Sequence, residues 1–129
     1  MTKKIECFQE IANAPKAVGP YSPAVKVGNM YFLSGQVGLN PATGTLVAAD
    51  IESQTEQALA NLKSVLTGLS LSFENVAKST IFLTDMANFQ TVNSLYGAAF
   101  GDHKPARSTI QVSALPLGAI VEIEMIAVS

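Results

Sequence analysis

The sequence predicts an α+β fold in which one mixed β-sheet carries two helices on one of its faces. Two segments, 51–69 and 88–100, have the apolar spacing of amphipathic helices. Each is followed by a strand-like segment, and turn signals near both ends of the chain favour hairpins. Helices and strands that alternate in this way pack as a sheet covered by its helices. The other face of the sheet is then left apolar and open.

The N-terminal part is predicted to form short strands separated by loops. The expected strands are 5–8, 24–27 and 30–34. Three prolines within residues 15–23 hold the first loop in an extended conformation. Gly28-Asn29 is a two-residue hairpin signal between the second and third strands. A surface loop then continues to Gly44.

The strongest helix prediction is 51–69, because its apolar residues fall on one face. These residues are Ala58, Leu59, Leu62, Val65, Leu66 and Leu69. A β-branched strand at 76–83 follows, and Thr84-Asp85 is a candidate cap for the second helix, 88–100. The apolar stripe of that helix is Phe89, Val92, Tyr96, Ala99 and Phe100. Two last strands, 107–112 and 120–128, are expected to form a hairpin through Pro116-Leu117-Gly118.

Composition indicates a single domain, 1–129, with a large core. The chain has 129 residues, of which 48% are hydrophobic and 14% charged, and its mean hydropathy is +0.29. This apolar content exceeds what a monomer of this size needs to bury, so we expect a homo-oligomer.

Charge and cysteine content exclude several classes of protein. The net charge is −2 and no basic stripe is visible, which does not favour a nucleic-acid partner. One cysteine, Cys7, and one histidine, His103, exclude a disulfide scaffold and a multi-ligand zinc site. We expect Cys7 to act as a small hydrophobe and His103 to cap the loop after the second helix. No segment has the length of a signal peptide core or a membrane span, so the expected location is cytoplasmic.

Arg107 is the only arginine, and it is the first candidate for function. No basic residue follows it, and the charges of the remaining segment are Glu122 and Glu124. A guanidinium presents a rigid fork of N–H donors that suits a planar carboxylate. Arg107 therefore indicates an anion-binding pocket. The alternative is a structural ion pair with Glu122 or Glu124 across the expected C-terminal hairpin.

The two glutamates share one face of the last strand, because side chains alternate with a period of two. Ile120, Ile126 and Val128 lie on that same face. A buried carboxylate without partners would be strongly destabilising, so each glutamate needs a partner or a water-accessible cleft. The alternative is a solvent-exposed strand edge.

Three further polar positions are informative. Asn93 falls on the apolar stripe of the second helix, where a buried amide must bind either a loop backbone or a ligand. Ser34 and Gly35 end a strand, where they offer a hydroxyl and a backbone that a ligand can approach closely. Tyr21, in the proline-stiffened loop, is either a surface ring or a wall of a binding site.

In order along the chain, several motifs resemble the reactive-intermediate deaminase family, RidA, also called YjgF. The motifs are Asn13-Ala14-Pro15 with Gly19-Pro20-Tyr21-Ser22, Ser34-Gly35-Gln36, Asn40-Pro41 with Thr43-Gly44, Asn93, Pro105-Ala106-Arg107-Ser108, and Ala114-Leu115-Pro116 leading to Val121-Glu122-Ile123-Glu124. Together they are highly specific and span nearly the whole chain. The resemblance implies a chorismate-mutase-like fold and a homotrimer with three clefts between neighbouring subunits.

The resemblance also implies an activity. Members hydrolyse reactive 2-enamine or 2-imine acids, released by serine or threonine dehydratases, to 2-keto acids and ammonia. Arg107 would clamp the substrate carboxylate, and Glu122 would position or activate water. The substrate-binding residues would be Tyr21, Ser34, Gly35, Asn93 and Thr109. Thr109 stands where many members have cysteine, which favours acid–base chemistry on water over a mechanism that needs a thiol.

No cofactor is expected, because an imine carbon is already electrophilic and only the substrate and a water need to be placed. Pairing with Arg107 would favour the ionised form of Glu122, whereas burial would oppose it. Two other functions are compatible with the same residues. One is a non-catalytic module that binds a 2-keto acid; the other is an RNA-directed role, which the acidic balance does not favour.

Overall fold

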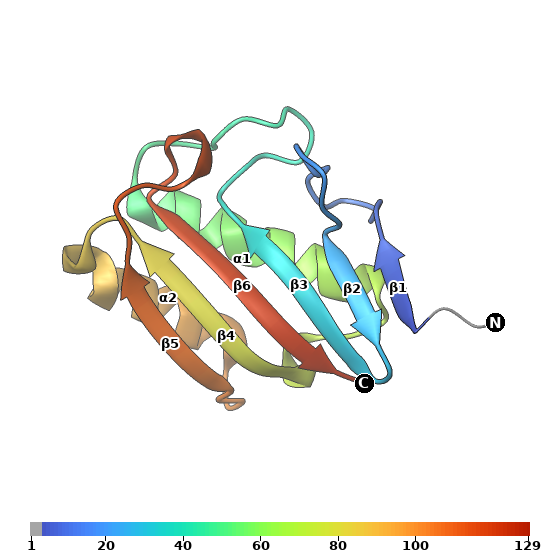
Figure 1. The fold of residues 1–129 in the computed structure, drawn as a ribbon. Coiled ribbons are helices and arrows are strands. Elements are labelled where there is room, and N and C mark those ends of the chain that lie inside the picture. Colours follow the sequence, from blue (N-terminus) through green and yellow to red (C-terminus); the bar gives the residue numbers. More distant parts are fainter. Residues whose placement is uncertain (1–3) are drawn as a thin grey trace.

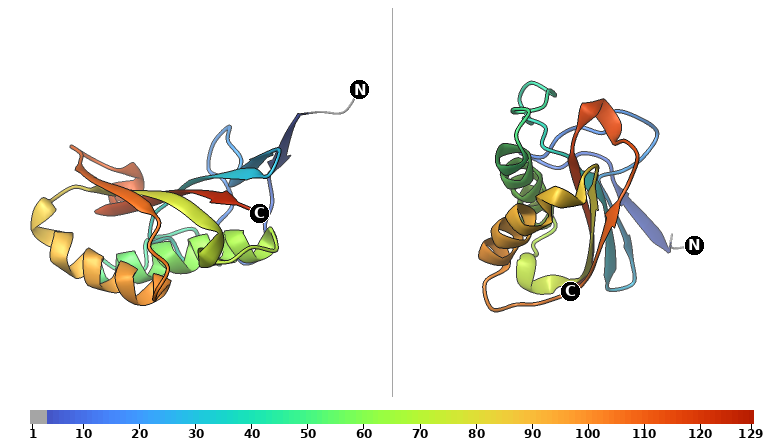
Figure 2. Two further views of the ribbon diagram at one scale, coloured as in Figure 1. Left: turned by 90° about the horizontal axis from the view of Figure 1, so that it is seen from below. Right: turned by 90° about the vertical axis from the view of Figure 1, so that its left-hand side faces the viewer.

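A computed structural model describes residues 4–129 as one six-stranded sheet with two helices packed against one face (Figures 1 and 2). The strands are β1 (Ile5–Phe8), β2 (Ala24–Val27), β3 (Met30–Gln36), β4 (Val76–Leu83), β5 (Ala106–Gln111) and β6 (Val121–Val128), and the helices are α1 (Ile51–Gly68) and α2 (Phe89–Phe100). Strand order is β1-β2-β3-β6-β4-β5, with β4 and β5 parallel and the other pairs antiparallel. The predicted fold class is confirmed.

The predicted hairpin between the last two strands is wrong. Strand β5 pairs only with β4, in parallel, and β6 is inserted between β3 and β4. Composition gives the physical reason. The β6 sequence is apolar at all but two of its positions, which suits a central strand, whereas β5 carries polar residues that suit an edge. Arg107 and the two glutamates therefore lie on strands that do not touch.

The first helix follows the prediction closely. All six residues of its expected stripe are buried, and the Asp50 side chain caps its start by accepting a hydrogen bond from the Ser53 backbone N–H at 2.7 Å. The second helix differs in two details. Asp85 caps the short 3-10 turn η2 (Met86–Asn88) by accepting from Ala87 N–H, and so does not cap α2. Ala99, expected in the core, is exposed, because only Val92, Tyr96 and Phe100 of α2 are buried.

Alternation along the central strands builds the core. In β6 the odd-numbered residues, Val121 to Ala127, are buried beneath the helices, while the even-numbered residues face away. Among the largest fully buried side chains are Leu62, Leu66, Ile81, Leu83, Ile123 and Met125. Truncating one of these leucines to alanine would cost about 2–5 kcal/mol.

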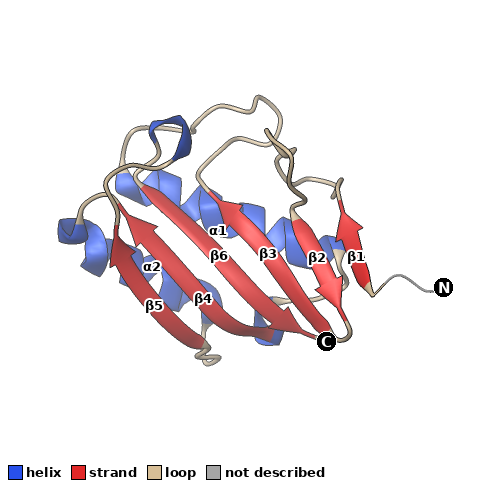
Figure 3. Ribbon diagram, viewed as in Figure 1, coloured by secondary structure: helices blue, strands red, loops and turns tan. Residues whose placement is uncertain are grey.

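Buried amides of α1 fix the loops at one end of the sheet. Gln54 donates to the Ala48 carbonyl and accepts from the Ile120 N–H at 2.9 Å, just before β6 begins. Asn61 donates to the carbonyls of Val37 and Leu39, just after β3 ends. Figure 3 shows the loops after β3, before β2 and before β6 gathered at this end. The end of β3 and the start of β6 are thereby held rigidly beside each other.

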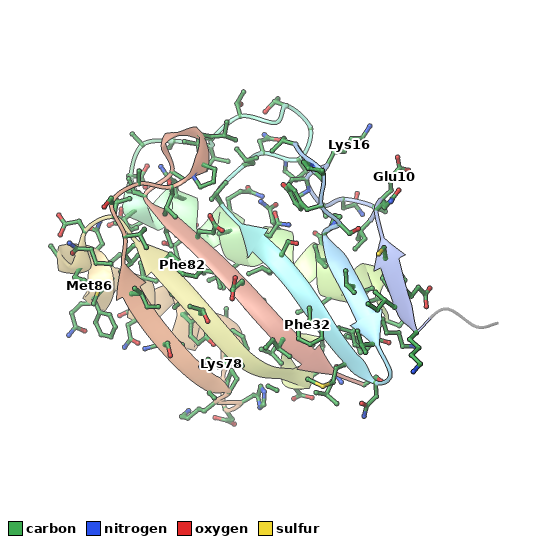
Figure 4. All side chains as sticks on the ribbon, viewed as in Figure 1. Glu10, Lys16, Phe32, Lys78, Phe82 and Met86 are labelled. Carbon is green, nitrogen blue, oxygen red and sulfur yellow. The ribbon has the colours of Figure 1, made fainter. Side chains whose placement is uncertain are left out.

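The sheet face opposite the helices is uncovered, as predicted, and it carries large apolar side chains together with Lys78 and the two β6 glutamates. Phe32, Phe82 and Lys78 project from it in Figure 4. Large apolar residues on this face and its edge are strongly exposed: Ile5 47%, Val27 39%, Met30 40%, Phe32 42% and Ile110 46%. Cys7 is also exposed, on the edge strand β1. Across residues 4–129, neither helix combines the length and the hydropathy needed to span a bilayer.

Candidate active site

Arg107 projects from β5 toward helix α2. Its strand neighbour is Ser79 of β4, which is fully buried under the helices. The guanidinium donates from Nη2 to Oδ1 of Asn93 at 2.8 Å. It also lies over two rings of α2, 5.0 Å from the Tyr96 centroid and 5.8 Å from the Phe89 centroid. Each such cation–π contact contributes about 0.5–2 kcal/mol.

These partners of Arg107 are all uncharged, so they orient its positive charge without neutralising it. Asn93 occupies one of five N–H donors, which leaves the guanidinium able to bind a carboxylate in its bidentate geometry. The role of Asn93 is thereby clear in this subunit: its amide oxygen holds Arg107 rather than a loop backbone. The alternative of a structural ion pair between Arg107 and a β6 glutamate is wrong, because the guanidinium is on the helix side of the sheet and the glutamates are on the other side.

A hollow of ≈ 420 Å³ adjoins the guanidinium. Its lining residues are Asn93, Tyr96, Gly97, Phe100, Gly101, His103, Lys104, Pro105 and Arg107. We call it the arginine hollow. The His103 Nε2 atom lies 2.7 Å from the Val76 carbonyl oxygen, so this ring fastens the loop after α2 to β4. Thr109 is two positions beyond Arg107 on the same side of β5, and it does not belong to this lining.

Glu122 projects from the opposite, open face of the sheet. Its strand neighbour on β4 is Phe82, three positions beyond the neighbour of Arg107. The carboxylate lies directly on Gly35 of β3, where a Cβ would overlap Oε1 and would stand 2.8 Å from Cδ. Only glycine leaves this space. The sequence suggested that Gly35 lets a ligand approach the backbone closely, whereas the group that lies against Gly35 in the structure is the Glu122 carboxylate.

Burial raises the pKa of Glu122 above its ordinary value of 4.5, and the nearby negative charge of Glu124 raises it further. Glu122 is half-buried while Glu124 is exposed, and β6 is a central strand. The alternative of a solvent-exposed strand edge is therefore wrong, although Glu124 does face solvent. A carboxylate with a raised pKa is a stronger base, and one beside open space can exchange protons with water.

A second hollow, of ≈ 390 Å³, opens beside Glu122, and we call it the glutamate hollow. Its lining residues are Pro15, Lys16, Ala17, Val18, Tyr21, Pro23, Ser34, Gly35, Gln36, Val37, Leu39, Pro116, Leu117, Glu122 and Glu124. The Ser34 hydroxyl donates to the Ser22 carbonyl at 2.7 Å and ties β3 to the proline-stiffened loop. Tyr21 in that loop is 47% exposed and accepts from the Val18 N–H at 3.4 Å, so it is both a surface ring and a wall.

The structure thus sorts the predicted site residues into two groups. Arg107 and Asn93 share the arginine hollow, and Tyr21, Ser34, Gly35 and Glu122 share the glutamate hollow. Thr109 lines neither of them. Within residues 4–129 no cluster of three or more His, Cys, Asp or Glu side chains is arranged to hold a metal ion. The structure therefore places Arg107 and the half-buried Glu122 on opposite faces of the sheet.

Sequence reasoning missed two residues of this arrangement. Phe89 and Tyr96 were expected only as core, yet their rings support the guanidinium of Arg107. For Tyr96 a signal existed, because a hydroxyl at a core position must find a partner. Nothing in the sequence distinguishes Phe89 from an ordinary core residue.

Comparison with known proteins decides the family. A family model described as Endoribonuclease L-PSP, the YjgF/RidA family, matches residues 11–129. The chain belongs to the RidA family. Protein DfrA of Myxococcus xanthus is 54% identical over 118 residues, which cover 90% of each chain. The 2-iminobutanoate/2-iminopropanoate deaminase of Mus musculus is 49% identical over 115 residues, 89% of this chain and 85% of the mouse protein.

Solved structures of the RidA family have the same fold. The crystal structure of YyfA from Yersinia pestis, described as a member of the conserved Rid family of unknown function, superposes with a TM-score of 0.93. It is 46% identical in sequence, and the match covers 97% of this chain and 99% of that one. The resemblance drawn from the motifs and the predicted fold are both confirmed.

Proposed function

We propose that this chain is a hydrolytic deaminase that converts 2-imino and 2-enamino acids to 2-keto acids and ammonia. The observation that carries the proposal is a guanidinium oriented by uncharged partners at the edge of a hollow, which suits a small carboxylic acid. Similarity to proteins named 2-iminobutanoate/2-iminopropanoate deaminase supports the same reaction.

The chemistry needs few groups. Arg107 binds the carboxylate of the imino acid, which reacts protonated on nitrogen, and Glu122 accepts a proton from a water as the water oxygen bonds to the imine carbon. Glu122 then gives this proton to the nitrogen of the resulting carbinolamine. The C–N bond breaks and ammonia leaves as the C=O bond forms, and the hydroxyl proton passes to Glu122 and on to solvent. The raised pKa of Glu122 brings the base nearer to neutral pH, where general-base catalysis is most effective. Neither a metal nor an organic cofactor enters the mechanism.

We further infer that the working site forms between subunits of a homotrimer. Arg107 and Glu122 of one subunit lie on opposite faces of the sheet, so one substrate does not reach both. The exposed apolar residues of the open face provide a surface for a neighbouring subunit to cover. In this arrangement the arginine hollow of one subunit meets the glutamate hollow of the next. Mass measurement in solution by sedimentation tests the trimer.

A coupled assay tests the activity. A threonine or serine dehydratase generates the imine, and its loss is followed directly with and without this protein. We expect keto-acid formation to be accelerated over the spontaneous rate. Saturable binding of a 2-keto acid without any acceleration would instead identify a non-catalytic binding module.

Mixing two inactive variants tests the shared site. Arg107→Lys and Glu122→Gln subunits are unfolded together and refolded as a mixture. If each site takes Arg107 from one subunit and Glu122 from another, about one quarter of the sites in an equal mixture are intact, and about that share of activity returns. If both residues act within one subunit, no activity returns. Each variant refolded alone is the control.

The description of the family names an endoribonuclease, but this chain carries little support for an RNA partner. Its net charge is −2, and the glutamate hollow contains two carboxylates that would repel phosphates. Retention of the protein on RNA at physiological salt would overturn this reasoning.

A further inference from the structure

Arg107 has a support of its own, built around Tyr96. The Tyr96 hydroxyl donates to Oγ of Ser79 at 2.8 Å, and both groups are buried. Ser79 is the strand neighbour of Arg107, so the tyrosine is fastened to the sheet beside the residue whose guanidinium lies over its ring. A tyrosine held at its hydroxyl end cannot swing away from the guanidinium without breaking this bond.

The ring of Tyr96 also packs against other aromatic rings. It stacks on Phe100 with centroids 4.4 Å apart, and Phe100 in turn lies 4.7 Å from Phe73. This row of aromatic residues ends at Arg107. Asn93, one turn earlier on α2, holds the edge of the same guanidinium. The guanidinium is therefore held at one face by the Tyr96 ring and at one edge by the Asn93 amide. Its remaining N–H donors consequently have a fixed direction.

We propose that Tyr96 and Ser79 are positioning residues that hold the Arg107 guanidinium in the orientation that binds the substrate carboxylate. This inference rests on the proposed function and deepens it. The Tyr96 hydroxyl is directed to buried Ser79, which does not line the arginine hollow. Their hydrogen bond acts through Arg107, so it contributes to substrate binding more than to the chemical step.

The state of the phenol fits this role. Burial raises the pKa of Tyr96 above its ordinary value of 10.0, against the opposing effects of Ser79 and Arg107. The side chain therefore stays protonated at neutral pH. A phenolate would compete with substrate as an internal counterion for Arg107, whereas a neutral ring supports the guanidinium and leaves its charge for the ligand.

Three variants test the proposal: Tyr96→Phe, Ser79→Ala and the double variant. Tyr96→Phe keeps the stacked ring and removes only the hydroxyl. We expect KM for the imino acid and Kd for 2-oxobutanoate to rise about three- to tenfold in each single variant, with kcat nearly unchanged. Because both substitutions remove one bond, the double variant should be no worse than either alone.

Tyr31→Phe is the matched control. Tyr31 is another buried tyrosine on the helix side of the sheet, but its ring lies by Lys26, away from the arginine hollow. KM and Kd should not change in this variant. If the Tyr96 and Ser79 variants lose thermal stability while KM and Kd stay at wild-type values, the two residues are merely structural and the proposal fails. It also fails if their effects on KM and Kd add in the double variant.

Binding and activity are measured separately so that the two proposals can fail separately. A wild-type protein that binds 2-oxobutanoate without accelerating imine loss would refute the deaminase assignment, and Kd alone would then judge the positioning role. A wild-type protein that does not bind 2-oxobutanoate would overturn the positioning role directly.

Discussion

The arginine hollow and the glutamate hollow support their charged groups in opposite ways. Arg107 is surrounded by neutral side chains of α2 that hold it at its edge and face, which favours one fixed orientation. Glu122 instead lies on a bare backbone at Gly35, half-buried and next to a like charge, so its ionised form is disfavoured. One sheet thus holds its arginine in a fixed orientation on one face and keeps a glutamate on the other face in an environment that opposes ionisation.

Glu122→Gln should have the largest effect, because it removes the base and keeps the shape. We expect kcat to fall by about 10²–10⁴ with little change in KM, as measured in the coupled assay. The same variant should unfold at a higher temperature than wild type at neutral pH. The raised pKa means that the folded state resists ionisation of Glu122, so this carboxyl destabilises the protein as pH rises through that pKa.

The stability difference should shrink as the pH falls through the raised pKa, and it should have largely vanished below 4.5, where the carboxyl is protonated in both the folded and the unfolded chain. Thermal melts of both proteins between neutral and acidic pH check this. A variant less stable than wild type at neutral pH would show that Glu122 is not held in an unfavourable charged state.

Arg107→Lys should reduce kcat/KM about a hundredfold without unfolding the protein, since a point charge does not reproduce the bidentate clamp. Steady-state kinetics and circular dichroism give the two readouts. Lys63→Arg, on the exposed side of α1, is the control for exchanging basic residues. A wild-type rate in Arg107→Lys would remove the guanidinium from the mechanism.

Gly35→Ala should act on the glutamate hollow alone. The added methyl overlaps the carboxylate of Glu122 and must displace it, so kcat should fall about tenfold while Kd for a 2-keto acid changes less. Added to Glu122→Gln, the substitution should cause no further loss of kcat. An additional loss of kcat in that background would mean that the Gly35 substitution acts by distorting the backbone of β3 rather than by displacing the Glu122 carboxylate.

Glu124→Gln should have the smallest effect, a shift of the pH profile. Activity requires ionised Glu122, so the rate falls as pH drops through its pKa. Removing the neighbouring negative charge lowers that pKa, and the acidic limb of log kcat against pH should move to lower pH. An unmoved limb would show that Glu124 does not influence the base.

Much of the fold was readable from local patterns, and much of the site was not. The stripe of α1 and the alternation in β6 follow from the two side-chain periods, so Leu62 was placed correctly in the core, and Glu122 and Glu124 were placed correctly on one face of their strand. The strand order at the C-terminus was missed. Apolar side chains on both faces of β6 favour a central position, whereas the short connection from β5 to β6 favours a hairpin, and the hairpin was the wrong choice.

The contacts that define the site are long-range, and local patterns do not contain them. Asn93 meets Arg107 because α2 packs over β5, and Gly35 meets Glu122 because β6 pairs with β3. Sequence reasoning selected the right residue types, since a lone arginine and a buried amide both need partners. The alternative pairing of Arg107 with Glu122 or Glu124 was wrong because it relied on a predicted hairpin that would have put the glutamates within reach of Arg107.

The central place of β6 gives that strand two separate duties. Its odd-numbered residues fill the interior, while Glu122 and its even-numbered companions lie on the open face, away from the helices. Under the proposed function, a library that varies only the even positions would therefore test substrate range and subunit pairing with little effect on the core. Randomising the odd positions would mostly yield chains that do not fold.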